Sequence, residues 1–222
     1  MVSWLILNGV LLLAVYLLGS IPTGFLAGKL FKGIDIREYG SGSTGATNVL
    51  RSVGKGPAIL VLLVDVLKGA LAIVLVYFTY GLSLAVPSTV EPALWQPWLV
   101  MLAGLLALLA HSRSIWLGFT GGKSAATGIG ILLAMHWPVG LGAIATFVTV
   151  LLLSRIVSLS SILASLSVFC LMLITHQPLS YILFAVAGGL YVILRHRSNI
   201  QRLLAGTEPR IGQQLNTSTQ KT

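Results

Sequence analysis

Seven long runs of apolar residues restrict this chain more than any other feature of its sequence. They lie near residues 3–26, 56–80, 94–111, 127–137, 138–154, 159–175 and 179–194. A helix needs about 20 apolar residues to cross a bilayer, and here 56% of the 222 residues are hydrophobic while only 9% are charged. One soluble core cannot hide so much apolar surface. We therefore expect an all-α fold, a polytopic membrane bundle of about seven transmembrane helices.

The fourth apolar run is too short to cross a membrane alone. At about 1.5 Å per residue, residues 127–137 reach roughly 16 Å of a hydrocarbon core near 30 Å. This run must therefore be shielded by neighbouring helices, or dip only partway into the membrane. A five-helix arrangement, in which this run and a neighbour merge or do not span, is the competing interpretation.

If each apolar run crosses the membrane, the loops between the runs lie alternately on its two sides. The cationic residues of these loops then all lie on one side. The side that contains Glu91, His136 and His176 has no lysine or arginine. The other side carries Lys29, Lys32, Arg37, Arg51, Lys55, Arg113, Lys123, Arg155, Arg195, Arg197, Arg202, Arg210 and Lys221. Because positively charged loops stay inside the cell, we expect loops 27–55, 112–126 and 154–158 and the C-terminus in the cytoplasm, with the N-terminus outside. The excess of cations then indicates membrane orientation rather than nucleic-acid binding.

The chain is expected to form one integral membrane domain over residues 1–205. Its first apolar run has no basic leader and no small-residue cleavage pattern, which favours a retained helix over a signal peptide. Residues 206–222 are rich in Gln, Asn, Thr and Ser and are expected to form a flexible cytoplasmic tail. Segment 27–36 mixes apolar and charged residues, so it is either a short interfacial helix or a solvated loop.

A polar run with little side-chain bulk, Gly40 to Asn48, interrupts the apolar pattern, and Arg51 follows it. Its glycines permit backbone turns closed to other residues, so bare N–H groups can face an oxyanion. Hydroxyl and amide side chains add hydrogen bonds, and the guanidinium adds charge. The run indicates a phosphate site; the alternatives are a flexible connector or a small-residue helix contact.

A second glycine-bearing run, Gly118 to Thr127, leads directly into the short fourth helix and contains Gly121, Gly122 and Lys123. Free N–H groups and the helix dipole both favour an anion at such a position. The run is not a Walker A loop, because no strand precedes it. The lysine also suits a second interpretation, that of an inside-facing topology anchor.

Two further clusters lie on the same side. In residues 154–161, hydroxyl groups surround an arginine, although Ser158 can simply cap the next helix. In residues 195–202, His196 and Asn199 share one helix face and could approach a common ligand. The neighbouring Arg197, Arg202 and Arg210 are better explained by attraction to anionic lipid headgroups.

Asp65 and Lys68 lie three residues apart within the second apolar run. Opposite charges at this spacing can neutralise each other inside a membrane, so the pair either pins the bundle or takes a direct part in chemistry. The five acidic residues are scattered along the sequence, which indicates no carboxylate cluster for Mg²⁺ or Mn²⁺. No His and Cys set suits zinc.

These motifs resemble, in order and over nearly the whole chain, the bacterial acyl-phosphate:glycerol-3-phosphate acyltransferases, integral membrane enzymes of phospholipid synthesis. The similar segments are Gly19-Ser20-Ile21-Pro22-Thr23, Gly40-Ser41-Gly42, Gly45-Ala46-Thr47-Asn48, Asp65-Val66-Leu67-Lys68-Gly69, Gly121-Gly122-Lys123, Ser158-Leu159, His196-Arg197-Ser198-Asn199-Ile200 and Arg202-Leu203-Leu204. The resemblance implies seven helices in the bacterial inner membrane, with the active site facing the cytoplasm.

The resemblance also implies transfer of a fatty acyl group from acyl-phosphate to the 1-hydroxyl of sn-glycerol 3-phosphate, giving lysophosphatidate and phosphate. No metal or other cofactor is expected, and a functional link to an enzyme that produces acyl-phosphate is implied. Among the residues carried over by motif, the catalytic set is Arg51, Lys123, His196 and Asn199. The substrate-binding set is Ser41, Gly42, Gly45, Thr47, Asn48, Gly121, Gly122, Ser158, Ser161 and Glu208.

Two other classes of function compete with this enzyme. A transporter or exchanger of phosphorylated small anions also needs anion-binding loops near a helix break, but its site should lie near the bilayer midplane. The motifs here gather at one surface instead. A lipid-bound scaffold without catalysis would bind the same anions without turnover.

Overall fold

The computed structural model describes residues 2–82 and 91–213, and within these ranges the chain is helical, with no strand longer than an isolated bridge between Ser114 and Thr120. The α-helices are α1 (Val2–Gly19), α2 (Thr23–Lys32), α3 (Ala46–Ser52), α4 (Lys55–Gly81), α5 (Pro92–Ser112), α6 (Ala125–Met135), α7 (Trp137–Ser154), α8 (Val157–Ile174), α9 (Leu179–Arg195) and α10 (Arg197–Leu204). Two short 3₁₀ helices, Ile36–Glu38 and Ile115–Leu117, lie in the loops.

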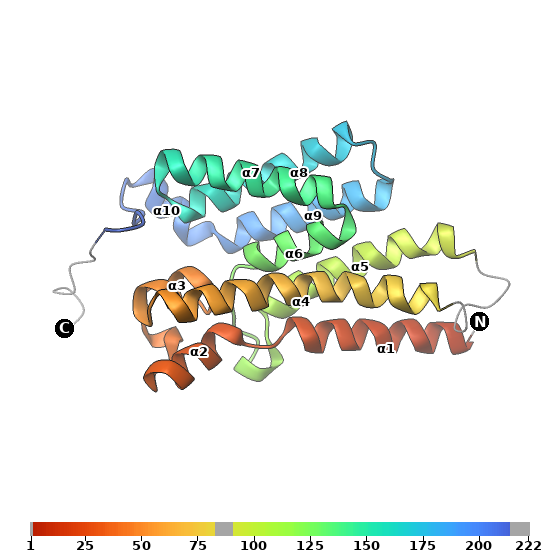
Figure 1. Cartoon of the computed structure of the whole chain (residues 1–222), viewed down its shortest axis with the longest axis horizontal. Helices are drawn as coiled ribbons and strands as arrows, with labels where there is room; N and C mark the ends of the chain where they lie inside the picture. Colours follow the sequence, from red (N-terminus) through yellow and green to blue (C-terminus); the bar gives the residue numbers. More distant parts are fainter. Residues whose placement is uncertain (1, 83–90, 214–222) are drawn as a thin grey trace.

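The seven apolar runs correspond to α1 and to α4 through α9, which confirms the expected all-helical membrane fold. Five segments are long and apolar enough to cross a membrane. A sixth is added if α9 and α10, which are bent by 62° at their junction, form one broken span. Helix α6 is too short to join them, as its sequence predicts. The long helices lie roughly side by side (Figure 1), so the bundle has one principal direction.

Helix α6 is shielded mainly by α4, and glycines permit the close approach of the two helices. A Cβ atom on Gly69 would come within 2.2 Å of the Thr127 carbonyl oxygen, and one on Gly130 within 1.8 Å of the Val66 oxygen. Small residues at such crossings let backbones pack without intervening side chains. The buried apolar core continues around α6 to Ile73 and Val100, both fully buried.

The first apolar run differs from its prediction, because it is broken near Pro22 rather than continuous to residue 26. Helix α1 ends at Gly19 and α2 begins at Thr23. Proline has no N–H to donate to the preceding turn, which explains the break. Helix α2 ends at Lys32, and the next residue, Gly33, has a φ of 69° that suits a left-handed helix terminus. Segment 27–36 is therefore mostly helical, which favours the helix over the loop.

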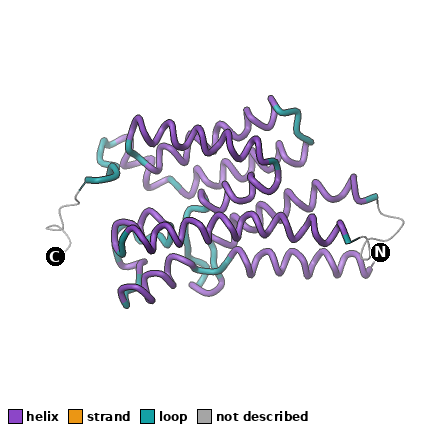
Figure 2. The backbone as a smooth tube through the Cα atoms, viewed as in Figure 1, coloured by secondary structure: helices purple, strands orange, loops and turns teal. Residues whose placement is uncertain are grey.

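The short helices α2, α3 and α10 gather at one end of the bundle, called here the polar end, and the N-terminus lies at the opposite end (Figure 1). Most of the loop backbone also lies toward the polar end (Figure 2). The remaining turns join helices at the opposite end of the bundle (Figure 2). The segments singled out in the sequence thus come together where the chain is least regular.

Candidate functional site

The side chain of Asn48, at the start of α3, organises the first glycine-bearing loop. Its Nδ2 donates to the carbonyl oxygens of Ile36 at 3.1 Å, Tyr39 at 2.9 Å and Ser43 at 2.9 Å. Its Oδ1 accepts a 3.0 Å hydrogen bond from the Ser41 N–H. Asn48 is buried, so its amide shapes the loop from inside.

Glycine is required in this loop for two separate reasons. Gly40 and Gly42 have φ angles of 59° and 67°, in the left-handed region. A Cβ on Gly40 would also lie 2.3 Å from Asn48 Oδ1. Ser41 and Gly42 remain exposed, while Gly45 and Thr47 are half-buried at the start of α3. The loop therefore presents small groups over a rigid, hydrogen-bonded base.

The second glycine-bearing loop, residues 113–124, folds back against the end of α5. A Cβ on Gly121 would lie 2.3 Å from the His111 carbonyl oxygen, and a Cβ on Gly122 would lie 2.1 Å from His111 Nε2. Arg195 Nη2 donates to the Gly122 oxygen at 3.0 Å and reaches the Gly121 oxygen at 3.5 Å. Contacts with α5 and with the end of α9 therefore hold the backbone directly before Lys123 in place.

Lys123 begins a continuous chain of hydrogen bonds across the polar end. Its Nζ donates to Asn199 Oδ1 at 2.6 Å, and Asn199 Nδ2 donates to Glu208 Oε1 at 2.6 Å. The same carboxylate oxygen accepts from Ser158 Oγ at 2.7 Å. The other oxygen, Oε2, accepts from Arg202 Nε at 2.7 Å. Glu208 therefore joins α8, α10 and the 113–124 loop into one polar unit.

Arg51 reaches this unit from helix α3, which follows the first loop. Its Nη2 lies 3.4 Å from the carbonyl oxygen of Pro209, the residue after Glu208. It is near enough to the Glu208 carboxylate to interact with that negative charge. The four polar clusters singled out in the sequence thus meet at the polar end.

His196 is held at the junction of α9 and α10. Its Nδ1 lies 2.7 Å from the Val192 carbonyl oxygen, and a carbonyl can only accept, so Nδ1 carries the proton. In the neutral ring Nε2 is then left as the acceptor. The ring is buried at 4% exposure and lies close enough to Lys123 and Glu208 to sense both charges.

The electrostatics of the unit depend on burial. Burial lowers the pKa of the Lys123 amine to about 8, and the positive charge of Arg202 acts in the same direction while Glu208 opposes it. Burial alone would raise the pKa of the Glu208 carboxyl. Hydrogen bonds from Asn199, Ser158 and Arg202 outweigh the effect of burial and hold the pKa of Glu208 below its ordinary value. Glu208 is therefore a carboxylate at neutral pH.

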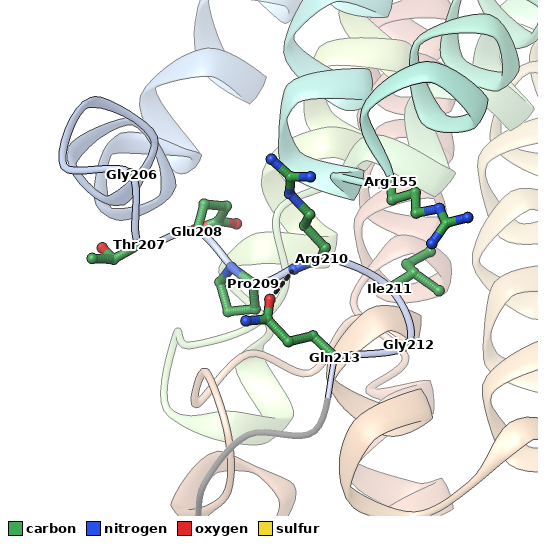
Figure 3. Close-up of a pocket in the computed structure, with 9 residues that line it drawn as sticks. All are labelled: Arg155, Gly206, Thr207, Glu208, Pro209, Arg210, Ile211, Gly212 and Gln213. Carbon is green, nitrogen blue, oxygen red and sulfur yellow. Dashed lines mark hydrogen bonds between the residues drawn. The ribbon is translucent and has the colours of Figure 1, made fainter.

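A cavity of about 570 Å³ adjoins the unit between Arg155 and residues 206–213, with Glu208 on its wall (Figure 3). The guanidinium groups of Arg155 and Arg210 point in different directions (Figure 3), so they do not converge on one anion. Ile211 N–H donates to the Arg155 carbonyl at 2.8 Å. The start of the predicted flexible tail is therefore packed against the bundle, while residues 214–222 lie outside the described part of the chain.

Some candidate residues do not join the unit directly. Ser161 Oγ donates to its own helix at the Val157 oxygen, at 3.0 Å. Two arginines that contact the site, Arg195 and Arg202, are not among the candidates from the sequence, where membrane orientation explains Arg195 and lipid headgroups explain Arg202. Arg202 lies three residues after Asn199 on the same helix, and that spacing was the available signal.

The ion pair expected within the second apolar run is present on α4. Lys68 Nζ lies 2.9 Å from Asp65 Oδ1, and both side chains are buried. Within residues 2–82 and 91–213, no three His, Cys, Asp or Glu side chains group into a metal site.

A bundle of apolar helices with a cationic, hydrogen-bonded site at one end defines a polytopic membrane protein equipped to hold anions. The chain belongs to a family described as "Glycerol-3-phosphate acyltransferase", because the sequence model of that family matches residues 9–206.

Curated relatives and solved structures agree with this assignment. The chain is 62% identical over 221 residues to the glycerol-3-phosphate acyltransferase of Nostoc sp. (strain PCC 7120), covering 98% of each chain. It is 59% identical over 217 residues to glycerol-3-phosphate acyltransferase 2 of Rhizobium johnstonii, covering 96% of this chain and 99% of the relative.

Among solved structures, the chain is similar to PlsY, an integral membrane glycerol 3-phosphate acyltransferase. The glycerol 3-phosphate form of PlsY matches with a TM-score of 0.81 and 37% identity, over 92% of this chain and 96% of PlsY. The lysophosphatidic acid form matches with a TM-score of 0.78 and 37% identity, over 92% and 95%.

Proposed function

We propose that this protein transfers a fatty acyl group from acyl-phosphate to the 1-hydroxyl of sn-glycerol 3-phosphate, giving 1-acyl-glycerol 3-phosphate and inorganic phosphate. The observation that carries the proposal is the Lys123–Asn199–Glu208 chain of hydrogen bonds, with His196 beside it and Arg51 tethered to the next residue. Support comes from family membership and from the PlsY structures, whose two forms carry this acceptor and this product.

The reaction needs little activation of the acyl donor, because acyl-phosphate is already a mixed anhydride. The protein must bring two anions together and stabilise the charge on the carbonyl oxygen and on the departing phosphate. We assign Arg51 and Lys123 to the phosphate groups, and His196 with Asn199 to the orientation of glycerol 3-phosphate. The loop residues Ser41, Gly42, Gly45, Thr47, Gly121 and Gly122 would line the phosphates.

In this mechanism the 1-hydroxyl oxygen bonds to the acyl carbon and the acyl–phosphate C–O bond breaks. The hydroxyl proton passes to a phosphate oxygen, with His196 Nε2 as the nearby alternative acceptor. An acyl-enzyme is not required. The hydroxyls of Ser158 and Ser161 are already committed, to Glu208 and to the Val157 carbonyl, and neither contacts His196 through a hydrogen bond.

We place the site at the cytoplasmic face of the bacterial inner membrane. Every lysine and arginine outside the apolar runs lies on the same side of the membrane as the polar end. The protein would then draw acyl-phosphate from an enzyme that produces it in the cell, and would release its product into the surrounding lipid.

Purified protein in detergent tests the proposal directly. It should convert acyl-phosphate and radiolabelled glycerol 3-phosphate into lysophosphatidate, releasing one phosphate per product. A carrier or a scaffold would leave acyl-phosphate intact, and that result would contradict the proposal. Acid quenching during turnover followed by mass spectrometry should find no acylated serine; a stable acyl-serine would reject the direct transfer while leaving the activity intact.

A further inference from the structure

A single carboxylate oxygen inside the bundle contacts side chains from three helices. Asp65 Oδ1 on α4 accepts a 2.6 Å hydrogen bond from Thr23 Oγ1 on α2 and lies 2.9 Å from Lys68 Nζ. His111 Nδ1 on α5 lies 3.5 Å from the same oxygen, is buried, and makes no hydrogen bond among the described residues. Asp65 and Lys68 are almost completely buried, at 1% and 3% exposure.

One arm of this cluster leads to the first glycine-bearing loop. Thr23 is the first residue of α2, and the next residue, Gly24, packs against that loop so closely that a Cβ would lie 1.7 Å from the Thr44 oxygen. Lys68 Nζ also donates to the Ile21 oxygen at 3.0 Å, in the break between α1 and α2. The position of the loop thus depends on where Asp65 and Lys68 hold the start of α2.

The other arm leads to the second glycine-bearing loop. The His111 ring lies against Gly122, and the His111 carbonyl accepts the Gly122 N–H at 3.3 Å. Gly122 directly precedes Lys123, whose amine starts the chain of hydrogen bonds to Asn199 and Glu208. The orientation of the His111 ring therefore bears on the position of the Lys123 backbone.

We propose that Asp65 is a positioning residue, which sets the distance between the two phosphate-binding loops without touching either substrate. The proposal rests on the proposed acyl transfer. A buried charge is held firmly by its partners, because few other arrangements satisfy it. Two substrates brought together by separate loops react only if the loops are placed accurately, and a shift of about 1 Å can cost roughly a hundredfold in rate.

Matched pairs of variants test each arm. Thr23→Val removes the hydroxyl at constant shape, whereas Thr23→Ser keeps it. His111→Gln removes the donor near Nδ1, whereas His111→Asn keeps an N–H near that position. We expect Thr23→Val and His111→Gln each to lower kcat/KM at least tenfold, and Thr23→Ser and His111→Asn to recover most of it. Thr146→Val is the control, because that hydroxyl bonds only its own helix at Gly142.

The shared role of the carboxylate is tested in an Asp65→Ala background, which removes both oxygen acceptors. There Thr23→Val and His111→Gln should each lower kcat/KM less than twofold further, since the link that they break is already gone. Full and separate losses in that background would overturn the proposal. If Asp65→Ala does not fold, the single-arm variants decide. Folded Thr23→Val protein with normal kcat and KM for both substrates would reject the proposal.

A pin that merely stabilises the bundle would behave differently. It would lower the unfolding temperature and the amount of active protein but leave the KM for both substrates unchanged, which would also reject the proposal. Wild-type protein without any acyltransferase activity would contradict the proposed function itself. Active wild-type protein whose arm variants are normal would contradict only the positioning role.

Discussion

Lys123 and Asn199, which are 76 positions apart in the sequence, are joined by a 2.6 Å hydrogen bond between Nζ and Oδ1. The bond links the loop before α6 to helix α10, and Asn199 passes it on to Glu208. The Lys123 amine is therefore oriented by Asn199, which we also assign to the orientation of the acceptor substrate.

Replacement of Lys123 should weaken phosphate binding most strongly. Lys123→Ala removes a charge-assisted contact, for which about 1.5–3 kcal/mol is typical, so kcat/KM should fall by roughly 10–100-fold. Lys55→Ala is the control, because Lys55 is also cationic but is exposed at the start of α4. Steady-state kinetics with both substrates measures the effect. Equal activity of the two variants would remove Lys123 from the site.

The pH dependence of kcat/KM should report the same amine. Since burial lowers the pKa of Lys123 to about 8, the amine loses its proton, and with it its charge, as the pH rises through that value. The kcat/KM should therefore be constant below about pH 8 and fall above it, by up to about tenfold per pH unit. Lys123→Arg keeps its charge, so its profile should lack this fall. An unchanged profile in Lys123→Arg would contradict the assignment.

Glu208→Gln should disrupt the polar unit. The neutral amide cannot accept from Ser158, Asn199 and Arg202 as the carboxylate does, and Arg202 loses its ion-pair partner. We expect at least a tenfold loss of kcat/KM, together with a lower unfolding temperature. Glu38→Gln, at an exposed position, should change neither quantity. A fully active Glu208→Gln enzyme would show that the carboxylate is dispensable.

Arg195→Met should act through the glycine carbonyls rather than through a substrate. Arg195 donates to the Gly122 oxygen at 3.0 Å, so its loss frees the loop that carries Lys123. We expect a higher KM for at least one substrate and faster proteolysis within residues 113–124. Arg197→Met is the matched control, since Arg197 is exposed next to it on α10. Equal kinetics and cleavage rates in the two variants would argue against the clamp.

Gly122→Ala should displace the second loop, because the added methyl group would lie 2.1 Å from His111 Nε2. The loop or the His111 ring must move, and we expect a loss of activity of at least tenfold in a protein that still folds. Gly56→Ala should be neutral, because nothing lies within 4 Å of a Cβ at that helical position. Parallel kinetics and thermal unfolding separate the two outcomes, and normal activity of Gly122→Ala would show that the loop tolerates the shift.

Some features of the site were predictable from local sequence, and others were not. The glycine runs could be found because special backbone angles leave a local pattern, whereas the face expected to join His196 to Asn199 required one continuous helix and the chain bends by 62° between α9 and α10. The inward role of Asn48 could not, since its three carbonyl partners lie at distances of 5 to 12 positions along the chain. Arg195 and Arg202 are not among the candidates from the sequence, because cations near a membrane have an ordinary explanation in topology.

By itself the sequence determined that the chain is helical and membrane-embedded, since long apolar runs leave no other way to satisfy the backbone in lipid. It also predicted which segments suit anions. Only the tertiary structure decided that Lys123, Asn199 and Glu208 form one chain, and that Asp65 lies between Thr23 and His111. Such contacts depend on how helices distant in sequence cross, and helix crossings are set by the packing of the whole bundle.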